Sequence, residues 1–258
     1  PSRNDWAGIL FDDLSDFWTS GSTMNCCKIE WANNGIKTVS TSDININNCR
    51  FCNFESSAVY ISGSETTIKG GSIQNFGSSG ISCEGSSVAS IENIIINQEK
   101  DFINKIDYSL IGAGIYAQNG AVVEVTGGTI SKCNIGIQGG QTGGPFPKYT
   151  IQNNSILNNN YGIYFVGNYI YSCNRDYWCT ILMPVTAEIH NNNIFNNSVY
   201  GLYAVNSLNG YKDQLNATGN WWGTTDMGAV GLNMIYDDSD NGSSPVVEFV
   251  PYLDKPFD

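Results

Sequence analysis

The stretch GIYAQNGAVVEVTGGTISKCNIGIQG, residues 114–139, contains one complete copy of the pattern that decides the fold. It opens with GIYA and closes with GIQG, two segments of the same type. Between them stand two short runs, VVEVT and GTIS, in which apolar and polar residues alternate. Alternation over so few residues is typical of short β-strands with one buried face, so the repeat predicts three short strands.

The same pattern recurs along the chain. Each copy begins with an apolar residue, has Asn or Gly two or three positions later, and has another apolar residue at plus five. The copies begin at Ile46, Ile68, Ile91, Val125, Ile151, Ile189 and Ala217. A minimum spacing of about 22 residues suits one turn of a parallel β-helix. We therefore predict one right-handed parallel β-helix of roughly seven to nine coils. Leucine-rich repeats are excluded, because neither their consensus nor helical stretches occur.

Asparagine recurs at the plus-two position, where the chain must bend between strands. Asn tolerates a left-handed backbone, so a bend is expected there. Identical side chains on successive coils can stack. The four asparagines expected to form such a ladder are Asn48, Asn93, Asn153 and Asn191.

The composition excludes several classes of protein. Charged residues make up 14% of the 258 residues, too few for a helical bundle, while 41% are hydrophobic, too many for a disordered chain. The net charge of −12 argues against nucleic acid and anionic lipid as partners. No apolar run approaches the ~20 residues that span a membrane. The chain opens without a signal peptide, and we expect it to be a module of a larger secreted protein.

Cysteine and acidic motifs give little indication of a metal. Cys49 and Cys52 form one C-x-x-C pattern, but the single histidine, His190, leaves no second ligand pair for zinc. Apolar packing of these cysteines is the simpler interpretation. Cys173 and Cys179 bracket a short polar loop, and a disulfide between them is one possible pairing. The DDSDNG run at Asp237 resembles part of a Ca²⁺ loop without its distal Glu, so a solvated turn is favoured and no cofactor is expected.

The two ends of the chain match a known type of protein. NWWGTTD at Asn220 is followed by VVEFVPYLD, and the opening reads WAGILF. These segments resemble the ends of extracellular right-handed β-helix repeat proteins. The matching residues are Trp221, Trp222, Phe249, Pro251 and Tyr252. The resemblance implies one domain over 1–258, in which 217–258 form a capping coil and strand over the open end of the core.

Insertions are concentrated at one corner of the predicted stack. Four of them, residues 12–24, 140–148, 166–185 and 206–214, follow the same strand of their coils, and a fifth, 97–112, lies earlier in its coil. Loops on one face of a solenoid often contain the functional residues. Their aromatics either face a ligand or pack the loops onto the barrel. They are Phe17, Trp18, Phe146, Tyr169, Tyr171, Tyr177, Trp178 and Tyr211.

The strand beside this corner has a row of outward residues. They are Tyr60, Ser82, Tyr116, Gln138, Tyr164 and Tyr203. Coils lie ~4.8 Å apart, so tyrosines on alternate coils repeat every ~10 Å, on the scale of two sugars of a flat β-1,4-linked glycan. They could stack on sugar faces while Ser82 and Gln138 bind hydroxyls. Alternatively, they only form a ladder that stabilises the sheet.

The sequence shows no established catalytic motif. A uronan lyase needs acids with Arg or Lys, and a polygalacturonase needs several Asp on one face. The outward row has no Asp. Carboxylates near the rim, which folding could bring together, are Asp12, Asp13, Asp16, Glu84, Asp176 and Asp213. A hydrolase or lyase that uses loop carboxylates therefore remains an alternative.

The chain resembles the β-helical carbohydrate-binding modules appended to gut bacterial xylanases. This resemblance implies a non-catalytic monomer that binds xylan or a related neutral β-glycan, needs no cofactor, and is tethered to a glycoside hydrolase domain. Its location would be secreted or at the bacterial cell surface. The residues expected to bind are Tyr60, Tyr116, Gln138, Tyr164 and Tyr203, with Tyr177, Trp178 and Trp18 from the rim. A structural adhesin is the third alternative.

Overall fold

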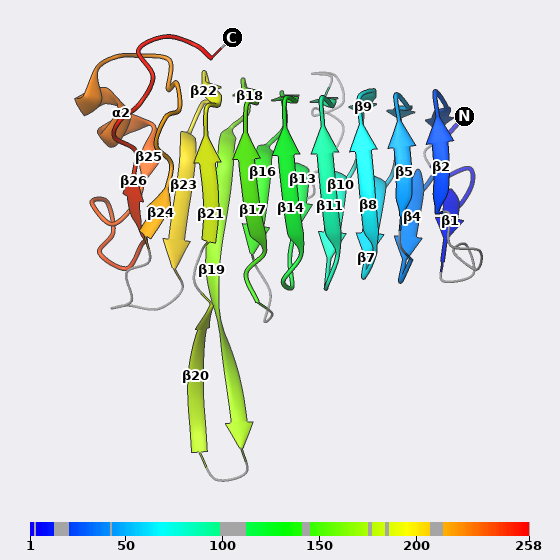
Figure 1. Cartoon of the computed structure of the whole chain (residues 1–258), viewed down its shortest axis with the longest axis horizontal. Coiled ribbons are helices and arrows are strands. Elements are labelled where there is room, and N and C mark those ends of the chain that lie inside the picture. Colours follow the sequence, from blue (N-terminus) through cyan, green and yellow to red (C-terminus); the bar gives the residue numbers. More distant parts are fainter. Residues whose placement is uncertain are drawn as a thin grey trace.

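The computed structural model describes residues 1–2, 4–12, 21–41, 43–98, 112–140, 145–174, 177–183, 186–206 and 214–257. For residues 168–174, 177–183 and 206 it describes the backbone only. Within these ranges nearly all regular structure is β-strand, arranged in three sheets. The strands of each sheet come from successive passes of the chain (Figure 1).

Each sheet takes one strand from each coil. The ten-stranded sheet contains, in order, β1 (Ile9–Phe11), β4 (Ile36–Val39), β7 (Ser57–Ser62), β10 (Ser79–Glu84), β13 (Ala113–Ala117), β16 (Ile135–Gly140), β19 (Tyr161–Asn174), β23 (Tyr200–Asn206) and β25 (Ile235–Tyr236), with β20 (Tyr177–Met183) beside β19. The nine-stranded sheet contains β2 (Ser22–Asn25), β5 (Ile44–Asn47), β8 (Glu65–Lys69), β11 (Val88–Glu92), β14 (Val122–Thr126), β17 (Lys148–Gln152), β21 (Thr186–His190), β24 (Gln214–Asn216) and β26 (Val246–Glu248). The seven-stranded sheet contains β3 (Lys28–Glu30), β6 (Arg50–Cys52), β9 (Ser72–Gln74), β12 (Ile95–Asn97), β15 (Thr129–Ser131), β18 (Ser155–Leu157) and β22 (Asn193–Phe195).

The pairing confirms the predicted parallel β-helix. Apart from β20, neighbouring strands within a sheet pair in parallel, and up to β23 the chain visits all three sheets before it returns to the first. Figure 1 shows the coils stacked side by side from the N-terminal to the C-terminal end. Because each coil pairs mainly with its two neighbours, any side chain that recurs once per coil is aligned along the stack.

The core is a column of aliphatic side chains inside the three sheets. In the ten-stranded sheet the aliphatic residues that directly precede the outward row have no exposed surface. They are Val59, Ile81, Ile115, Ile137, Ile163 and Leu202. Burying each such side chain contributes roughly 1.5–3 kcal/mol, so repetition of this pattern stabilises the stack.

The chain bends at the corner asparagines as expected, but these asparagines do not form the continuous ladder that was predicted. Asn48 and Asn93 have φ of 51° and 53°, in the left-handed region. Gly70, with φ of 65°, occupies the equivalent corner between them, so the predicted ladder is not continuous.

A buried ladder forms one position further along. Asn154 Nδ2 donates to Asn192 Oδ1 at 3.0 Å, and Asn192 Nδ2 donates to Asn220 Oδ1 at 2.9 Å. All three side chains are buried. The ladder forms here because amides pointing inward need partners, whereas corner amides can reach water.

The C-terminal coil closes the core. Trp222 is completely buried, and Phe249 and Tyr252 pack against the core, while Pro251 is exposed. The chain also forms a short helix that the sequence pattern did not predict, α2 (Met227–Asn233), which is capped by Asp226. No helix among the described residues is long and apolar enough to cross a membrane.

The insertions leave from the predicted corner. The segments that follow β1, β16 and β23 all continue from strands of the ten-stranded sheet. In the coil of β19 the strand runs on past its neighbours and pairs antiparallel with β20. This hairpin projects from the stack (Figure 1).

Candidate functional site

One outward row crosses the whole ten-stranded sheet, and we call it the tyrosine row. Its residues pair in register from coil to coil. They are Leu10, Lys37, Tyr60, Ser82, Tyr116, Gln138, Tyr164, Tyr203 and Tyr236. The alignment predicted for the six central residues is therefore correct. The five tyrosines are each half-buried, so each keeps part of its surface exposed.

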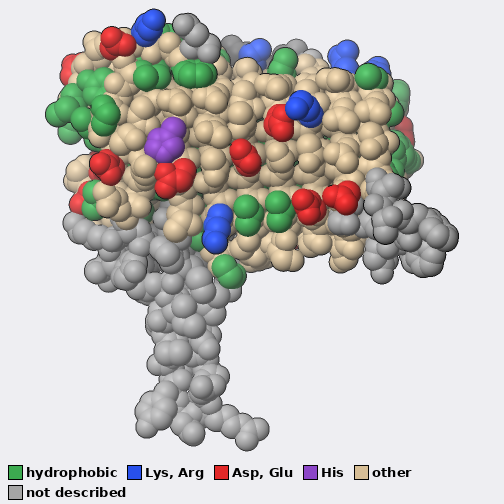
Figure 2. Space-filling view, in the orientation of Figure 1, with side chains coloured by type: hydrophobic (Ala, Val, Ile, Leu, Met, Phe, Trp, Pro, Cys, Tyr) green, Lys and Arg blue, Asp and Glu red, His purple; other side chains and the backbone are tan. Residues whose placement is uncertain are grey.

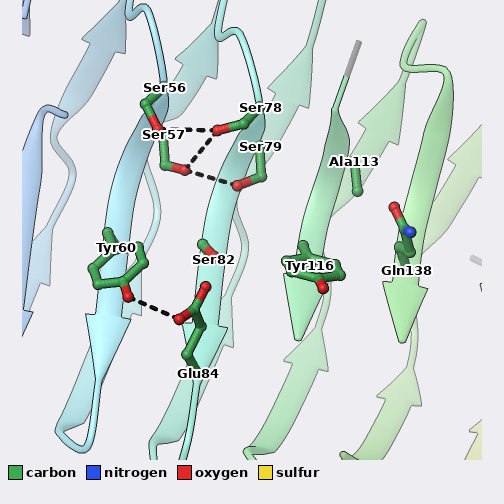
Figure 3. Close-up of a pocket in the computed structure, with 10 residues that line it drawn as sticks. All are labelled: Ser56, Ser57, Tyr60, Ser78, Ser79, Ser82, Glu84, Ala113, Tyr116 and Gln138. Carbon is green, nitrogen blue, oxygen red and sulfur yellow. Dashed lines mark hydrogen bonds between the residues drawn. The ribbon is translucent and has the colours of Figure 1, made fainter. Parts of the chain in front are cut away.

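A notch interrupts the row between Tyr60 and Tyr116. The residue between these two large side chains is Ser82, whose short side chain leaves a pocket of about 270 Å³ (Figure 3). We call this pocket the notch. It is lined by Ser56, Ser57, Tyr60, Ser78, Ser79, Ser82, Glu84, Ala113, Tyr116 and Gln138.

Glu84 has a fixed position in the notch. The Tyr60 hydroxyl donates to Glu84 Oε2 at 2.8 Å, and Figure 3 shows the two side chains pointing toward one another from neighbouring strands. Tyr116 instead donates to Gln118 Oε1 at 2.7 Å, on its own side of the notch. The carboxylate therefore enters the notch with one oxygen already bound to a phenol.

Serine hydroxyls form the other end of the notch. Ser57 Oγ lies 2.8 Å from Ser79 Oγ and 3.3 Å from Ser78 Oγ, and Ser56 Oγ lies 3.1 Å from Ser78 Oγ. A hydroxyl is both a donor and an acceptor with two lone pairs, so the cluster retains hydrogen-bonding capacity.

Two groups of the notch have polar atoms that the described hydrogen bonds do not use. Neither the Ser82 hydroxyl nor the Gln138 side-chain amide has a partner among the described residues. The Gln138 bond that is present uses its backbone oxygen, which accepts from Tyr149. These side chains are therefore available to a ligand.

The surroundings of the notch favour neutral phenols. Burial, followed by the hydrogen bond and charge of Glu84, raises the pKa of Tyr60. Burial and the same carboxylate raise the pKa of Tyr116. The electrostatic effect of Glu84 thus reaches both tyrosines that flank the notch.

The C-terminal half of the row is built differently, as a cluster that we call the tyrosine block. It contains Tyr161, Tyr164, Tyr200, Tyr203 and Tyr236. Tyr203 stacks on Tyr164 with ring centroids 4.9 Å apart and on Tyr236 at 4.4 Å. Both faces of the Tyr203 ring are therefore covered by neighbouring rings, which leaves its edge and hydroxyl to meet a ligand.

Sequence reasoning missed three members of this block, namely Tyr161, Tyr200 and Tyr236. Tyr161 pairs with Tyr200 across the coils, and their rings stack at 6.5 Å. Tyr161 and Tyr200 each precede a Gly-apolar-Tyr segment, in YGIY and YGLY, and this repeated motif could have identified these two, whereas Tyr236 has no such motif.

Three of the predicted binding residues lie outside the described side chains. Trp18 belongs to a segment outside the described residues. Tyr177 and Trp178 lie in β20, where only the backbone is described. The side chains of Cys173 and Cys179 are outside the description as well, although the hairpin register pairs Cys173 with Trp178.

Of the rim aromatics, Phe146 packs inward. It is buried, and its ring meets Phe165 edge-on at 5.4 Å. For this residue the packing alternative is correct.

Acidic side chains do not converge in the described part of this face. Glu84 is the one carboxylate among the residues that line the notch. Asp12 lines a separate pocket at the N-terminal end. The other carboxylates considered near the rim, Asp13, Asp16, Asp176 and Asp213, fall outside the described residues.

The histidine lies on a different face. His190 Nε2 is 2.8 Å from Glu188 Oε2, and Nδ1 is 2.9 Å from the Thr218 oxygen, both on the nine-stranded sheet. Figure 2 shows this sheet from outside, with the single histidine in purple among scattered charged side chains. Glu188 is exposed and His190 is half-buried, and both belong to β21 of the nine-stranded sheet rather than to the sheet that forms the notch.

The described residues contain no group of three or more His, Cys, Asp or Glu that could hold a metal ion. In the loop at Asp237, the carboxylate Oδ1 accepts from the backbone nitrogen of Ser239 at 2.9 Å, as in a simple turn. Cys49 and Cys52 are buried, and the Cys49 thiol donates to the Asn47 oxygen at 3.4 Å and accepts from the Cys27 backbone nitrogen at 3.4 Å.

Comparison with known proteins places this architecture. The model of the family described as "Right handed beta helix region" matches residues 7–221. The chain belongs to the right-handed β-helix family. Searches of curated proteins and of solved structures found no match. The right-handed β-helix family is associated with polysaccharide-related proteins in general. Membership of the family establishes the fold but does not identify a ligand, which has to be argued from the side chains of the tyrosine row.

Proposed function

We propose that this chain is a non-catalytic carbohydrate-binding module that binds a neutral plant β-glycan, such as xylan, on the ten-stranded sheet. The supporting observation is the tyrosine row, in which aromatic side chains aligned by the coils flank a notch of polar groups. Sites for small ligands typically combine apolar surface with a few placed polar groups. Here Ser82 and Gln138 have free hydrogen-bonding atoms between the rings of Tyr60, Tyr116 and Tyr164.

The spacing supports a ligand that runs along the stack. Tyr60, Tyr116 and Tyr164 stand on alternate coils, so they repeat every ~10 Å. A flat β-1,4-linked glycan repeats every two sugars on a similar scale. Each aromatic contact would contribute roughly 1 kcal/mol beyond the buried area, which corresponds to weak or moderate affinity.

Charge supports a neutral ligand and binding without cleavage. A chain with a net charge of −12 repels polyanionic sugars but not neutral ones. Glycoside hydrolysis generally uses a pair of carboxylates, and among its described lining residues the notch has Glu84 alone. The proposed contacts need no cofactor. In this proposal the module acts as a monomer tethered to a glycoside hydrolase domain, secreted or at the bacterial cell surface.

Affinity electrophoresis against a panel of polysaccharides tests the proposal. We expect neutral β-glycans to retard the protein, and no reducing ends or unsaturated products to appear after long incubation. Tyr116→Ala should weaken binding about fivefold, the equivalent of ~1 kcal/mol, because it removes one ring of the row. Phe257→Ala, which removes an exposed aromatic at the C-terminal end, is the matched control and should bind normally.

Other outcomes of these experiments would support an alternative function or overturn the assignment of the binding face. Release of products would support a hydrolase or lyase. Failure of every polysaccharide to retard the protein would support a structural adhesin. Normal binding by Tyr116→Ala would overturn the assignment of the tyrosine row.

A further inference from the structure

We propose that the notch holds one saccharide unit and that Glu84 is a specificity-determining residue, which accepts hydroxyls of an uncharged unit and rejects a uronate. This inference rests on the proposed function and specifies which sugars the site accepts. It follows from the position of Glu84, the one carboxylate among the described residues that line the notch.

The size of the notch suits one sugar unit. Pockets for drug-sized ligands measure roughly 300–1,000 Å³, and the notch, at about 270 Å³, lies just below this range. Along the stack the notch begins at Tyr60 and reaches past Tyr116 to Gln138, so its small volume, rather than these two rings, limits what it holds. A glycan lying over the row can therefore insert one unit or one branch here, but not a longer segment.

Glu84 is positioned to accept hydrogen bonds. The Tyr60 hydroxyl occupies Oε2, and no described contact occupies Oε1. A carboxylate accepts hydroxyls in charge-assisted bonds that are roughly twice as strong as neutral ones. Ser82, on the same strand as Glu84, and Gln138, two coils further along the stack, provide further donors and acceptors. The arrangement therefore favours a unit rich in hydroxyls.

The same carboxylate disfavours an anion. Burial raises the pKa of both Tyr60 and Tyr116, and the charge of Glu84, which lies between them on β10, raises both further. The described part of the tyrosine row has one cation, Lys37, which lies over the Tyr60 ring at 5.2 Å. Lys37 belongs to β4, on the side of β7 away from the notch, so it does not neutralise Glu84 within the pocket.

The variant Glu84→Gln separates charge from shape. The amide has the size of the carboxylate, and its oxygen can still accept from Tyr60. Calorimetric titration would use a linear β-1,4-xylooligosaccharide of about six units and the same backbone with one glucuronic acid branch. Wild-type protein should bind the neutral ligand at least about fivefold more tightly than the acidic one, and Glu84→Gln should reduce this ratio to about one. Raising the salt from roughly 0.02 to 0.5 M should reduce the wild-type ratio, because salt screens exposed charges.

The control is Glu124→Gln, which removes the same charge from an exposed position on the nine-stranded sheet. It should keep the wild-type ratio. The inference would be overturned if Glu84→Gln kept the wild-type ratio of neutral to acidic ligand affinity, or if Glu84→Gln and Glu124→Gln lowered this ratio equally. Either result would leave the proposed function intact. If the wild-type protein binds neither ligand nor any polysaccharide of the panel, the proposed function itself fails.

Discussion

The two halves of the tyrosine row differ in what stands between the tyrosines. Between β7 and β16, tyrosines alternate with Ser82 and Gln138. From β19 to β25 each coil has a tyrosine, and the rings stack on one another. The same residue type, on the same face of the same sheet, thus forms a pocket in one half and a continuous aromatic ladder in the other.

The spacing of the coils explains this difference. Adjacent coils lie ~4.8 Å apart, close to the stacking distance of two rings. Tyrosines on adjacent coils therefore cover each other's faces, as Tyr164 and Tyr203 do at 4.9 Å. A single short residue between two tyrosines separates the rings and opens space for a ligand. We infer that the first half is built for binding and that the second half mainly stabilises the sheet.

Removal of the middle ring of the block should have the largest effect. We expect Tyr203→Ala to lower the free energy of unfolding by about 2–3 kcal/mol, because it removes a half-buried ring and two stacked pairs. Tyr116→Ala removes no stacked pair of this kind and should cost about 1 kcal/mol. Urea denaturation followed by fluorescence measures both. Equal losses would show that the two halves do not differ in this respect.

Filling the notch should convert the first half into a copy of the second. We expect Ser82→Tyr to weaken glycan binding at least about tenfold, or ~1.4 kcal/mol, because the new ring occupies the space between Tyr60 and Tyr116. Stability should stay equal or rise by roughly 0.5–1 kcal/mol from the new ring contacts. Calorimetric titration and urea denaturation test the two parts. Ser90→Tyr, on the same coil but on the nine-stranded sheet, is the control and should leave binding unchanged.

The fold could be predicted from the sequence because its causes are local and repeated. Alternating residues such as Ile115 and Ile137 recur once per coil, and parallel pairing then fixes which neighbours they meet. Helix α2 could not be predicted this way, because it occurs once, in the cap, and depends on Asp226 at its N-terminus. Repetition made the solenoid predictable, and its absence hid helix α2 within the predicted capping coil.

The site could be predicted only in part, because a strict period of two fails at one end of these strands. In β19, Gly162 and Ile163 are both buried, so alternation counted back from Tyr164 assigns Tyr161 to the wrong face. The notch was also missed. Its depth depends on the difference in size between Ser82 and the tyrosines of adjacent coils, and on the bond that holds Glu84 in place.

The free amide in the notch half should matter for binding but not for stability. We expect Gln138→Ala to weaken binding about threefold to fivefold, the value of one hydrogen bond of ~0.5–1 kcal/mol, because its side chain has no partner within the described protein. The free energy of unfolding should change by less than about 0.5 kcal/mol. Gln152→Ala, an outward glutamine of β17 on the nine-stranded sheet, is the control. A large loss of stability in Gln138→Ala would assign this residue to the scaffold.

The smallest effect is expected in alkaline solution, where the tyrosine block should titrate late. Burial, and then the neighbouring phenols, raise the pKa of Tyr203, and burial raises that of Tyr164. A raised pKa in the folded state means that the unfolded chain loses its protons first as the pH rises. The stabilisation is therefore fully present below pH 10, the ordinary value, and is lost as the pH rises through the folded pKa. Tyr203→Phe keeps a stackable ring without the ionisable group, so its stability should fall less than that of the wild type above pH 10. Urea midpoints of both proteins, measured below and above pH 10 together with absorbance at the phenolate band, test this expectation. An equal fall in stability of the two proteins above pH 10 would contradict the raised pKa of Tyr203.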